Sequence, residues 1–162
     1  MISVSAASVG RMRVARTIVY VIAQCLGSLV AAWALLVSLG EESEASARGL
    51  CGLESGVEGR VLVRESALGF LLLFVIHATA MDPQQAAALG PVIPPFIIGL
   101  AVALLFAASF TIAPGTAFNA SRCFGPAILQ QQQNHYLHWV GNAIAVLLLR
   151  GYIALLSPEY LK

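Results

Sequence analysis

The sequence predicts an all-α protein that crosses a membrane several times. Of its 162 residues, 59% are hydrophobic and only 10% are charged, and the mean hydropathy is +0.83. A soluble domain carries roughly a quarter charged residues, so this chain lacks the side chains that would cover a surface in water. Its charged residues are separated by uncharged stretches long enough to span a bilayer. The net charge of +1 and the lack of basic clusters exclude nucleic acid as a partner.

The first predicted span covers about residues 14–39. Arg11, Arg13 and Arg16 precede an uncharged stretch over residues 17–40, which exceeds the ~20 residues that a helix needs to cross the hydrocarbon core. No small-residue cleavage site follows it, so the stretch is not a signal peptide. Residues 41–65 then hold most of the acidic side chains, interleaved with glycine and serine, and are predicted to be a loop in water.

Three further spans are predicted, at about residues 61–81, 94–113 and 136–157. The first of them reaches full length only if the last residues of the charged segment, 61–65, begin the helix, which would bring Glu65 to the edge of the membrane. The first of these ends at Asp82-Pro83, because proline disfavours helix at the residue before it and lacks a backbone donor. The next begins after a group of prolines and ends at a second proline-glycine break. The last ends at a serine-proline pair.

A shorter apolar segment between the last two spans predicts a re-entrant half-helix at about residues 119–130. Residues 120–129 would form about 15 Å of helix, half the thickness of the hydrocarbon core. Asn119 is a favoured N-cap residue, so the positive end of the helix dipole would lie near the middle of the membrane. The polar residues 130–134 suit the exit of the chain.

The distribution of charges predicts the orientation. The arginines before the first span make that end basic, whereas residues 41–65 are predominantly acidic. The N-terminus is therefore expected on the inside. Four spans return the C-terminus to the same side, and the half-helix enters from the outer face.

Three stretches resemble the major intrinsic protein family, which comprises the aquaporins and glycerol facilitators. Residues 115–127 read Gly-Thr-Ala-Phe-Asn-Ala-Ser-Arg-Cys-Phe-Gly-Pro-Ala, which is similar to the family's second signature, Asn-Pro-Ala-Arg followed by Gly-Pro-Ala. Residues 20–27 look like the start of the third membrane helix, and residues 138–141 like the entry into the sixth. The resemblance implies a single aquaporin-like membrane domain over residues 1–162, a right-handed helical bundle with four of the usual six spans.

The resemblance implies a passive channel for water or small neutral solutes such as glycerol. Its pore signature would be Asn119, Ala120, Ser121 and Arg122. In the family, the asparagine amide donates to the passing molecule, and the arginine lies at the narrowest point and repels cations. Without the resemblance, Asn119 would be an N-cap only. An arginine in an apolar half-helix costs at least ~2.5 kcal/mol, which favours a functional role for Arg122 over a structural one.

Other residues correspond by position to functional groups of the family. Phe106, Thr116 and Arg122 match its selectivity filter, and simple helix packing is an equal alternative for Phe106. Glu65 resembles a buried glutamate that accepts hydrogen bonds from the re-entrant loop; the alternative is a carboxylate in an interfacial loop. Gln24, a polar residue within a span, is expected to give structural support through a hydrogen bond to a neighbouring helix.

The sequence also departs from the family. Val4, Ser5 and Ala6 stand where the first Asn-Pro-Ala is expected, and Val4 has no amide to donate. Asn142 replaces a proline of the sixth helix. The first two helices of the family have no counterpart, so the chain is expected to be truncated at its N-terminus. Either the gene model is truncated, or a short product has lost transport and is a non-conducting membrane interaction or structural protein, or a decayed paralogue.

No enzyme, cofactor or metal site is expected. The histidines do not lie at metal-ligand spacing with a carboxylate. The odd number of cysteines leaves at least one unpaired, and their spacing matches neither a metal nor a redox motif. Cys25 and Cys123 lie in apolar runs and are interpreted as small buried hydrophobic residues. The expected partners are water or a small neutral solute, the lipid bilayer and, from the family, three further copies in a homotetramer. No motif indicates a particular membrane.

Overall fold

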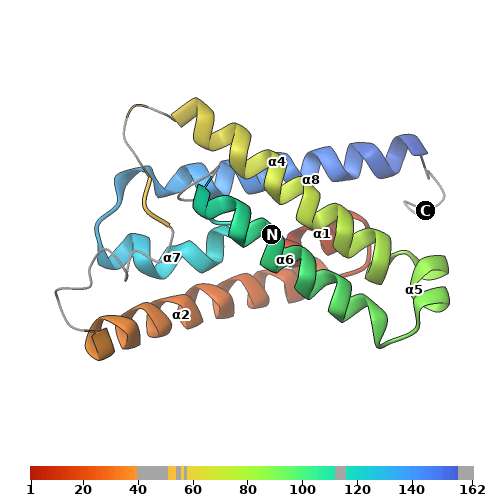
Figure 1. Cartoon of the computed structure of the whole chain (residues 1–162), viewed down its shortest axis with the longest axis horizontal. Coiled ribbons are helices and arrows are strands. Elements are labelled where there is room, and N and C mark those ends of the chain that lie inside the picture. Colours follow the sequence, from red (N-terminus) through yellow and green to blue (C-terminus); the bar gives the residue numbers. More distant parts are fainter. Residues whose placement is uncertain (40–50, 54–55, 57, 112–115, 157–162) are drawn as a thin grey trace.

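The computed structural model describes residues 1–39, 51–53, 56, 58–111 and 116–156, and within these ranges it is helical and contains no strand. The elements are α1 (Ile2–Ser8), α2 (Val14–Leu39), α4 (Glu58–Ile76), the π-helical turn η2 (His77–Met81), α5 (Pro83–Leu89), α6 (Ile93–Thr111), α7 (Ala120–Leu129), the 3₁₀ turn η3 (Gln133–His135) and α8 (Tyr136–Leu156) (Figure 1). The predicted all-α class is confirmed.

Several of the described helices are long and apolar enough to cross a membrane. Three meet this condition alone, over residues 14–38, 58–81 and 133–155. A fourth would result if α5 and α6, which are bent by 104° relative to each other, together make one span. The ten-residue α7 is too short to cross a bilayer.

Helices α4 and α8 cross each other in close contact (Figure 1). Glycines allow the close approach, as small residues do between membrane helices. A Cβ at Gly69 would lie 3.1 Å from the Cβ of Ala145. A Cβ at Gly141 would overlap the Cβ of Glu65. The core therefore lies where these two helices meet.

Buried apolar side chains surround this contact. They come from α4, α8, the start of the chain and the segment before α7: Met1, Leu72, Leu73, Ile76, Phe118, Ala145, Val146 and Leu149. Apolar side chains of α6 pack against the same cluster. The segment that leads into α7 is thus anchored in the main core.

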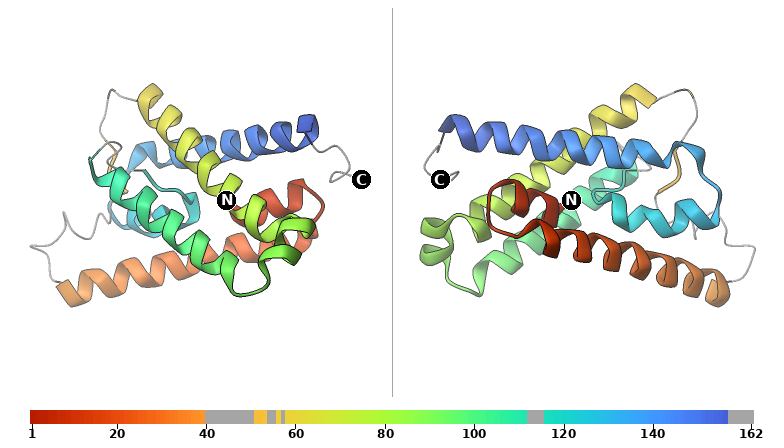
Figure 2. Two further views of the ribbon diagram at one scale, coloured as in Figure 1. Left: turned by 45° about the vertical axis from the view of Figure 1, so that its right-hand side comes forward. Right: turned by 180° about the vertical axis from the view of Figure 1, so that it is seen from behind.

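Helix α2 lies apart from this core, on the other side of α7 (Figures 1 and 2). Most of its large apolar side chains are exposed, and Trp33 is 61% accessible. Thr17 and Ala32 are its buried residues. Its main contacts are with α7 and α1. Helix α2 is therefore attached to the rest of the fold mainly through these two short helices.

The two short helices α1 and α7 start close together near the middle of the molecule (Figure 2, right). The backbone nitrogen of Met1 donates to Oδ1 of Asn119 at 3.1 Å. Helix α1 begins at Ile2 with Met1 in the N-cap position, so residues 4–6 lie inside the helix. The assignment of Val4-Ser5-Ala6 to a degenerate first signature stays a prediction. Ser5 already accepts an intrahelical bond from the N–H of Val9.

Helix α5 was not predicted, although its signal is present in the sequence. The carboxylate of Asp82 accepts from the N–H groups of Gln84 at 2.8 Å and Gln85 at 3.3 Å. Pro83 occupies the first helical turn, where its missing donor is not needed. Asp-Pro therefore both ends the preceding helix and starts the next.

Candidate functional site

The turn before α7 determines where the signature residues lie. Asn119 is the N-cap residue, with extended backbone angles of φ −148° and ψ 113°, and its side chain makes no capping bond. Phe118 has φ +55°, which is uncommon for a residue with a side chain. Its ring is buried and lies 4.8 Å from the ring of Phe106. Packing thus holds a strained conformation at the start of the half-helix.

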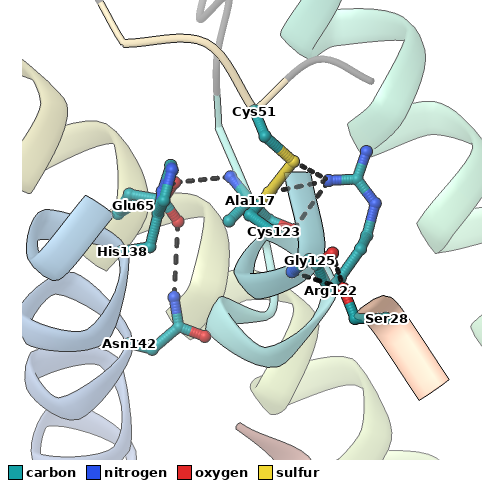
Figure 3. The surroundings of a disulfide bond; sticks show 9 residues. All are labelled: Ser28, Cys51, Glu65, Ala117, Arg122, Cys123, Gly125, His138 and Asn142. Carbon is teal, nitrogen blue, oxygen red and sulfur yellow. Dashed lines mark hydrogen bonds and ion pairs between the residues drawn. A yellow bond between two sulfur atoms is a disulfide. The ribbon is translucent and has the colours of Figure 1, made fainter. Parts of the chain in front are cut away.

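The guanidinium of Arg122 is fixed from several directions. Its Nη1 donates to the carbonyl of Ala117 at 3.4 Å and to the sulfurs of Cys51 at 3.3 Å and Cys123 at 3.2 Å (Figure 3). The same guanidinium lies 4.9 Å from the centre of the Phe106 ring, a favourable position for a cation on an aromatic face. The structure therefore brings together Phe106 and Arg122, two of the three predicted filter residues.

A disulfide lies beside this arginine. Cys51 and Cys123 are bonded, with their Cα atoms 5.5 Å apart, although 72 residues separate them in the chain. The interpretation of Cys123 as an ordinary buried hydrophobic residue is therefore wrong, because the fold brings it next to Cys51. The spacing in the sequence could not show this proximity. Cys25 is free and half-buried.

Glu65 is fully buried on α4 and joins three parts of the structure. Its Oε1 accepts from the N–H of Ala117 and lies 2.7 Å from Nδ1 of His138. Its Oε2 accepts from Nδ2 of Asn142 at 3.3 Å (Figure 3). The carboxylate thus connects α4, α8 and the segment before α7, and it does not lie in an interfacial loop.

Ser28 supports α7 from the side of α2. Pro126 lies inside α7 and has no N–H, so the carbonyl of Arg122 loses its helical donor. The hydroxyl of Ser28 donates to that carbonyl at 2.7 Å and accepts from the N–H of Gly125 at 2.9 Å. A Cβ at Gly125 would overlap the backbone carbonyl of Ser28. Ser28 was not predicted; the signal was a proline four residues after the signature arginine.

Asn119 and Arg122 line a common cavity of about 420 Å³ between α2 and α7, together with Gln24, Ser28 and Cys51. Gln24 is exposed and makes no hydrogen bond to any other described residue. Its role as a structural support therefore stays a prediction. Thr116 is buried, at 3% exposure, and does not line this cavity.

The wall of this cavity is largely apolar, with side chains such as Ala31 and Leu35, and its polar part offers hydrogen-bond donors and positive charge. The amide of Asn119 and the guanidinium of Arg122 both donate, and arginine has no acceptor. Such a wall suits a neutral polar molecule and opposes a cation. Across the described ranges, no three His, Cys, Asp or Glu side chains lie close enough to hold a metal ion.

The sequence model of the major intrinsic proteins matches residues 1–149. The chain is 37% identical over 139 residues to a probable aquaporin TIP-type of Medicago truncatula, which covers 83% of the chain and 52% of that protein. It is 33% identical over 155 residues to probable aquaporin TIP3-2 of Arabidopsis thaliana, and the match covers 94% of this chain and 53% of that protein. It is 30% identical over 143 residues to aquaporin-4 of Bos taurus, and the match covers 87% of this chain and 43% of that protein. The chain spans about half the length of these relatives.

Proposed function

The chain belongs to the major intrinsic protein family, and we propose that Asn119 and Arg122 lie at the narrow part of a passive channel for water or small neutral solutes. Together with the apolar helices, this membership makes the chain an integral membrane protein. Membership of this family also fits a protein that is not an enzyme. The relatives named above are called aquaporins, which supports a role in water transport.

One observation carries the proposal: Asn119 and Arg122 line the same cavity, and the arginine is held there by fixed partners. A charged side chain within the membrane-spanning part of a protein is costly and marks a transport pathway by default. A neutral molecule that passes this wall would exchange its hydrogen bonds with water for bonds to the two donors. A cation would meet the positive charge of Arg122 instead.

The ring of Phe106 supports a narrow opening that favours water over glycerol. It lies against the guanidinium of Arg122 and packs on Phe118, so a bulky aromatic side chain stands beside the proposed constriction. We expect Phe106→Ala to raise the ratio of glycerol to water permeability. An unchanged ratio would assign Phe106 to helix packing alone.

Flux measurements on the native protein test the proposal. The protein is reconstituted into vesicles, and water and glycerol permeability are followed by light scattering after an osmotic step. Arg122→Ala and Asn119→Asp are expected to change the permeability several-fold, whereas Arg60→Ala, which removes an exposed arginine of α4, should not. Permeability that neither site variant changes would refute the channel.

Two further outcomes have defined meanings. An absence of flux from protein that is demonstrably folded would favour the alternative of a non-conducting membrane protein. The homotetramer implied by the family is also part of the proposal, and native mass spectrometry in detergent tests it. A purely monomeric mass under conditions that keep the protein folded would contradict it.

A further inference from the structure

We propose that His138 and Asn142 are positioning residues that fix Arg122 through Glu65. The inference rests on the proposed function, since it concerns the same constriction. Neither residue contacts Arg122 directly. Both act through a series of hydrogen bonds that begins on α8.

The carboxylate of Glu65 is held from α8 at both oxygens. His138 and Asn142 lie one turn apart on the same face of that helix. Nδ1 of His138 lies 2.7 Å from Oε1, and Nδ2 of Asn142 donates to Oε2 at 3.3 Å (Figure 3). Gly141 lies between them in the sequence, and any side chain there would overlap Glu65. Three neighbouring positions of α8 are thus shaped around one carboxylate.

From Glu65 the series continues to the arginine. The N–H of Ala117 donates to Oε1 of Glu65, and the carbonyl of the same residue accepts from Nη1 of Arg122 at 3.4 Å. Ala117 is fully buried, so water does not compete for either bond. The position of Ala117 therefore follows that of Glu65, and the carbonyl of Ala117 is one of the partners that fix the guanidinium.

The polar atoms of the two α8 residues indicate what they contribute. His138 and Asn142 are 1% and 5% exposed, and within the described part of the chain Nε2 of His138 and Oδ1 of Asn142 have no hydrogen-bond partner. Unpaired polar atoms in the interior are destabilising, and apolar side chains of similar shape would pack without this cost. The gain is the pair of contacts to Glu65, whose carboxylate would otherwise be buried with too few partners.

Amide hydrogen exchange of the full chain in nanodiscs tests the proposal. We expect His138→Phe and Asn142→Leu to speed the exchange of the Ala117 amide about tenfold, the effect of losing a hydrogen bond that holds a charged group. The amides in the middle of α4 and α8 should keep their protection. Leu149→Ala serves as the control, because it removes a fully buried side chain of α8 from the core without touching Glu65.

Two conservative variants separate positioning from packing. In His138→Asn the amide nitrogen lies as many bonds from Cα as Nδ1 does, so the donor to Glu65 is retained. In His138→Gln the nitrogen corresponds to Nε2, and the donor is lost. We expect near-normal exchange at Ala117 for the asparagine variant and fast exchange for the glutamine variant. If His138→Phe does not fold, this pair decides the question.

The outcomes are distinct. Equal exchange in the asparagine and glutamine variants, or a rise at all amides as in Leu149→Ala, would overturn the proposal. Water permeability measured on the same nanodisc-derived protein in vesicles should fall in the variants with fast Ala117 exchange. If Ala117 exchanges faster in the variants as expected, but no protein shows water flux, the unsubstituted one included, the positioning role of His138 and Asn142 is supported and the channel is refuted.

Discussion

Helix α7 lies between two unlike regions, the α4–α8 pair and α2 (Figures 1 and 2). In the most apolar part of α4 and α8, 44% and 39% of the residues are buried, against 6% in α2. On the α4–α8 side, a buried carboxylate holds the segment before α7. On the α2 side, the hydroxyl of Ser28 bonds to the backbone of α7, and Gly125 allows the two helices to come close.

The difference separates stability from site geometry. The α4–α8 side combines a packed apolar core with a buried polar network, so removal of the carboxylate at the centre of that network should destabilise the protein most. The α2 side has little buried surface, and its contacts act directly on the backbone of Arg122. Changes there should alter the site more than the stability. Four predictions test this contrast, and each change in stability is measured by thermal unfolding in detergent, followed by circular dichroism.

The largest effect is expected for Glu65→Leu. It leaves the N–H of Ala117, His138 and Asn142 without their buried partner, and removal of one member of a buried pair lowers the free energy of unfolding by about 3–5 kcal/mol. Glu58→Gln, which affects an exposed bond at the start of α4, is the control. A decrease of less than about 1 kcal/mol in the free energy of unfolding would contradict the view that the α4–α8 side determines stability.

Removal of the disulfide should come next. Cys51→Ser combined with Cys123→Ser opens a closure over 72 residues, for which a loss of about 2–4 kcal/mol is typical. Cys25→Ser changes the free cysteine and should leave unfolding nearly unchanged. If a dithiol reductant lowers the melting temperature of the unsubstituted protein but not of the double variant, the bond is responsible. Equal melting temperatures for the unsubstituted protein, the double variant and Cys25→Ser would show that the disulfide does not stabilise the fold.

Gly125→Ala tests the close contact of α7 with α2. The added methyl would overlap the backbone of Ser28, and the forced shift should cost about 1–3 kcal/mol. Gly99→Ala is a matched control on α6, where a Cβ would meet nothing within 4 Å and alanine is the better helix former. If the two variants melted alike, α2 and α7 would not be in close contact.

The smallest change in stability is expected for Ser28→Ala. It removes two hydrogen bonds and leaves the carbonyl of Arg122 without its donor, at a cost of about 1–2 kcal/mol. The effect on permeability should exceed that of Gly125→Ala relative to the loss of stability. Ser38→Ala, which affects an exposed hydroxyl bonded to its own helix, is the control. If Ser28→Ala changed neither the stability nor the permeability, α2 would not support the site.

Much of the fold follows from local patterns. Helices α2 and α8 lie almost within the predicted ranges 14–39 and 136–157, and α7 lies within the predicted half-helix. Long uncharged runs, prolines and an N-cap asparagine suffice to locate such helices. The missing helix also has a local cause. Asp82-Pro83 both ends one helix and starts α5, and the prediction uses only the first of these two roles.

The candidate site divides in the same way. Asn119 and Arg122 are recognisable from a short motif, and the proximity of Phe106 to Arg122 agrees with its expected position. Ser28, His138 and the bond between the two cysteines required the folded structure. Each involves partners from different helices, and nothing in the residues around one partner identifies the other.

Composition and short-range pattern were thus sufficient for the class of protein and its long helices, and the resemblance of one short motif to a family located the two residues on which the proposed function rests. Hydrophobicity, helix starts and proline breaks act over a few turns, so they can be read along the chain. The partners of Arg122 and Glu65 are a different kind of property. They depend on how α2, α4 and α8 approach α7, and glycines and buried polar groups that are distant in sequence set that approach together.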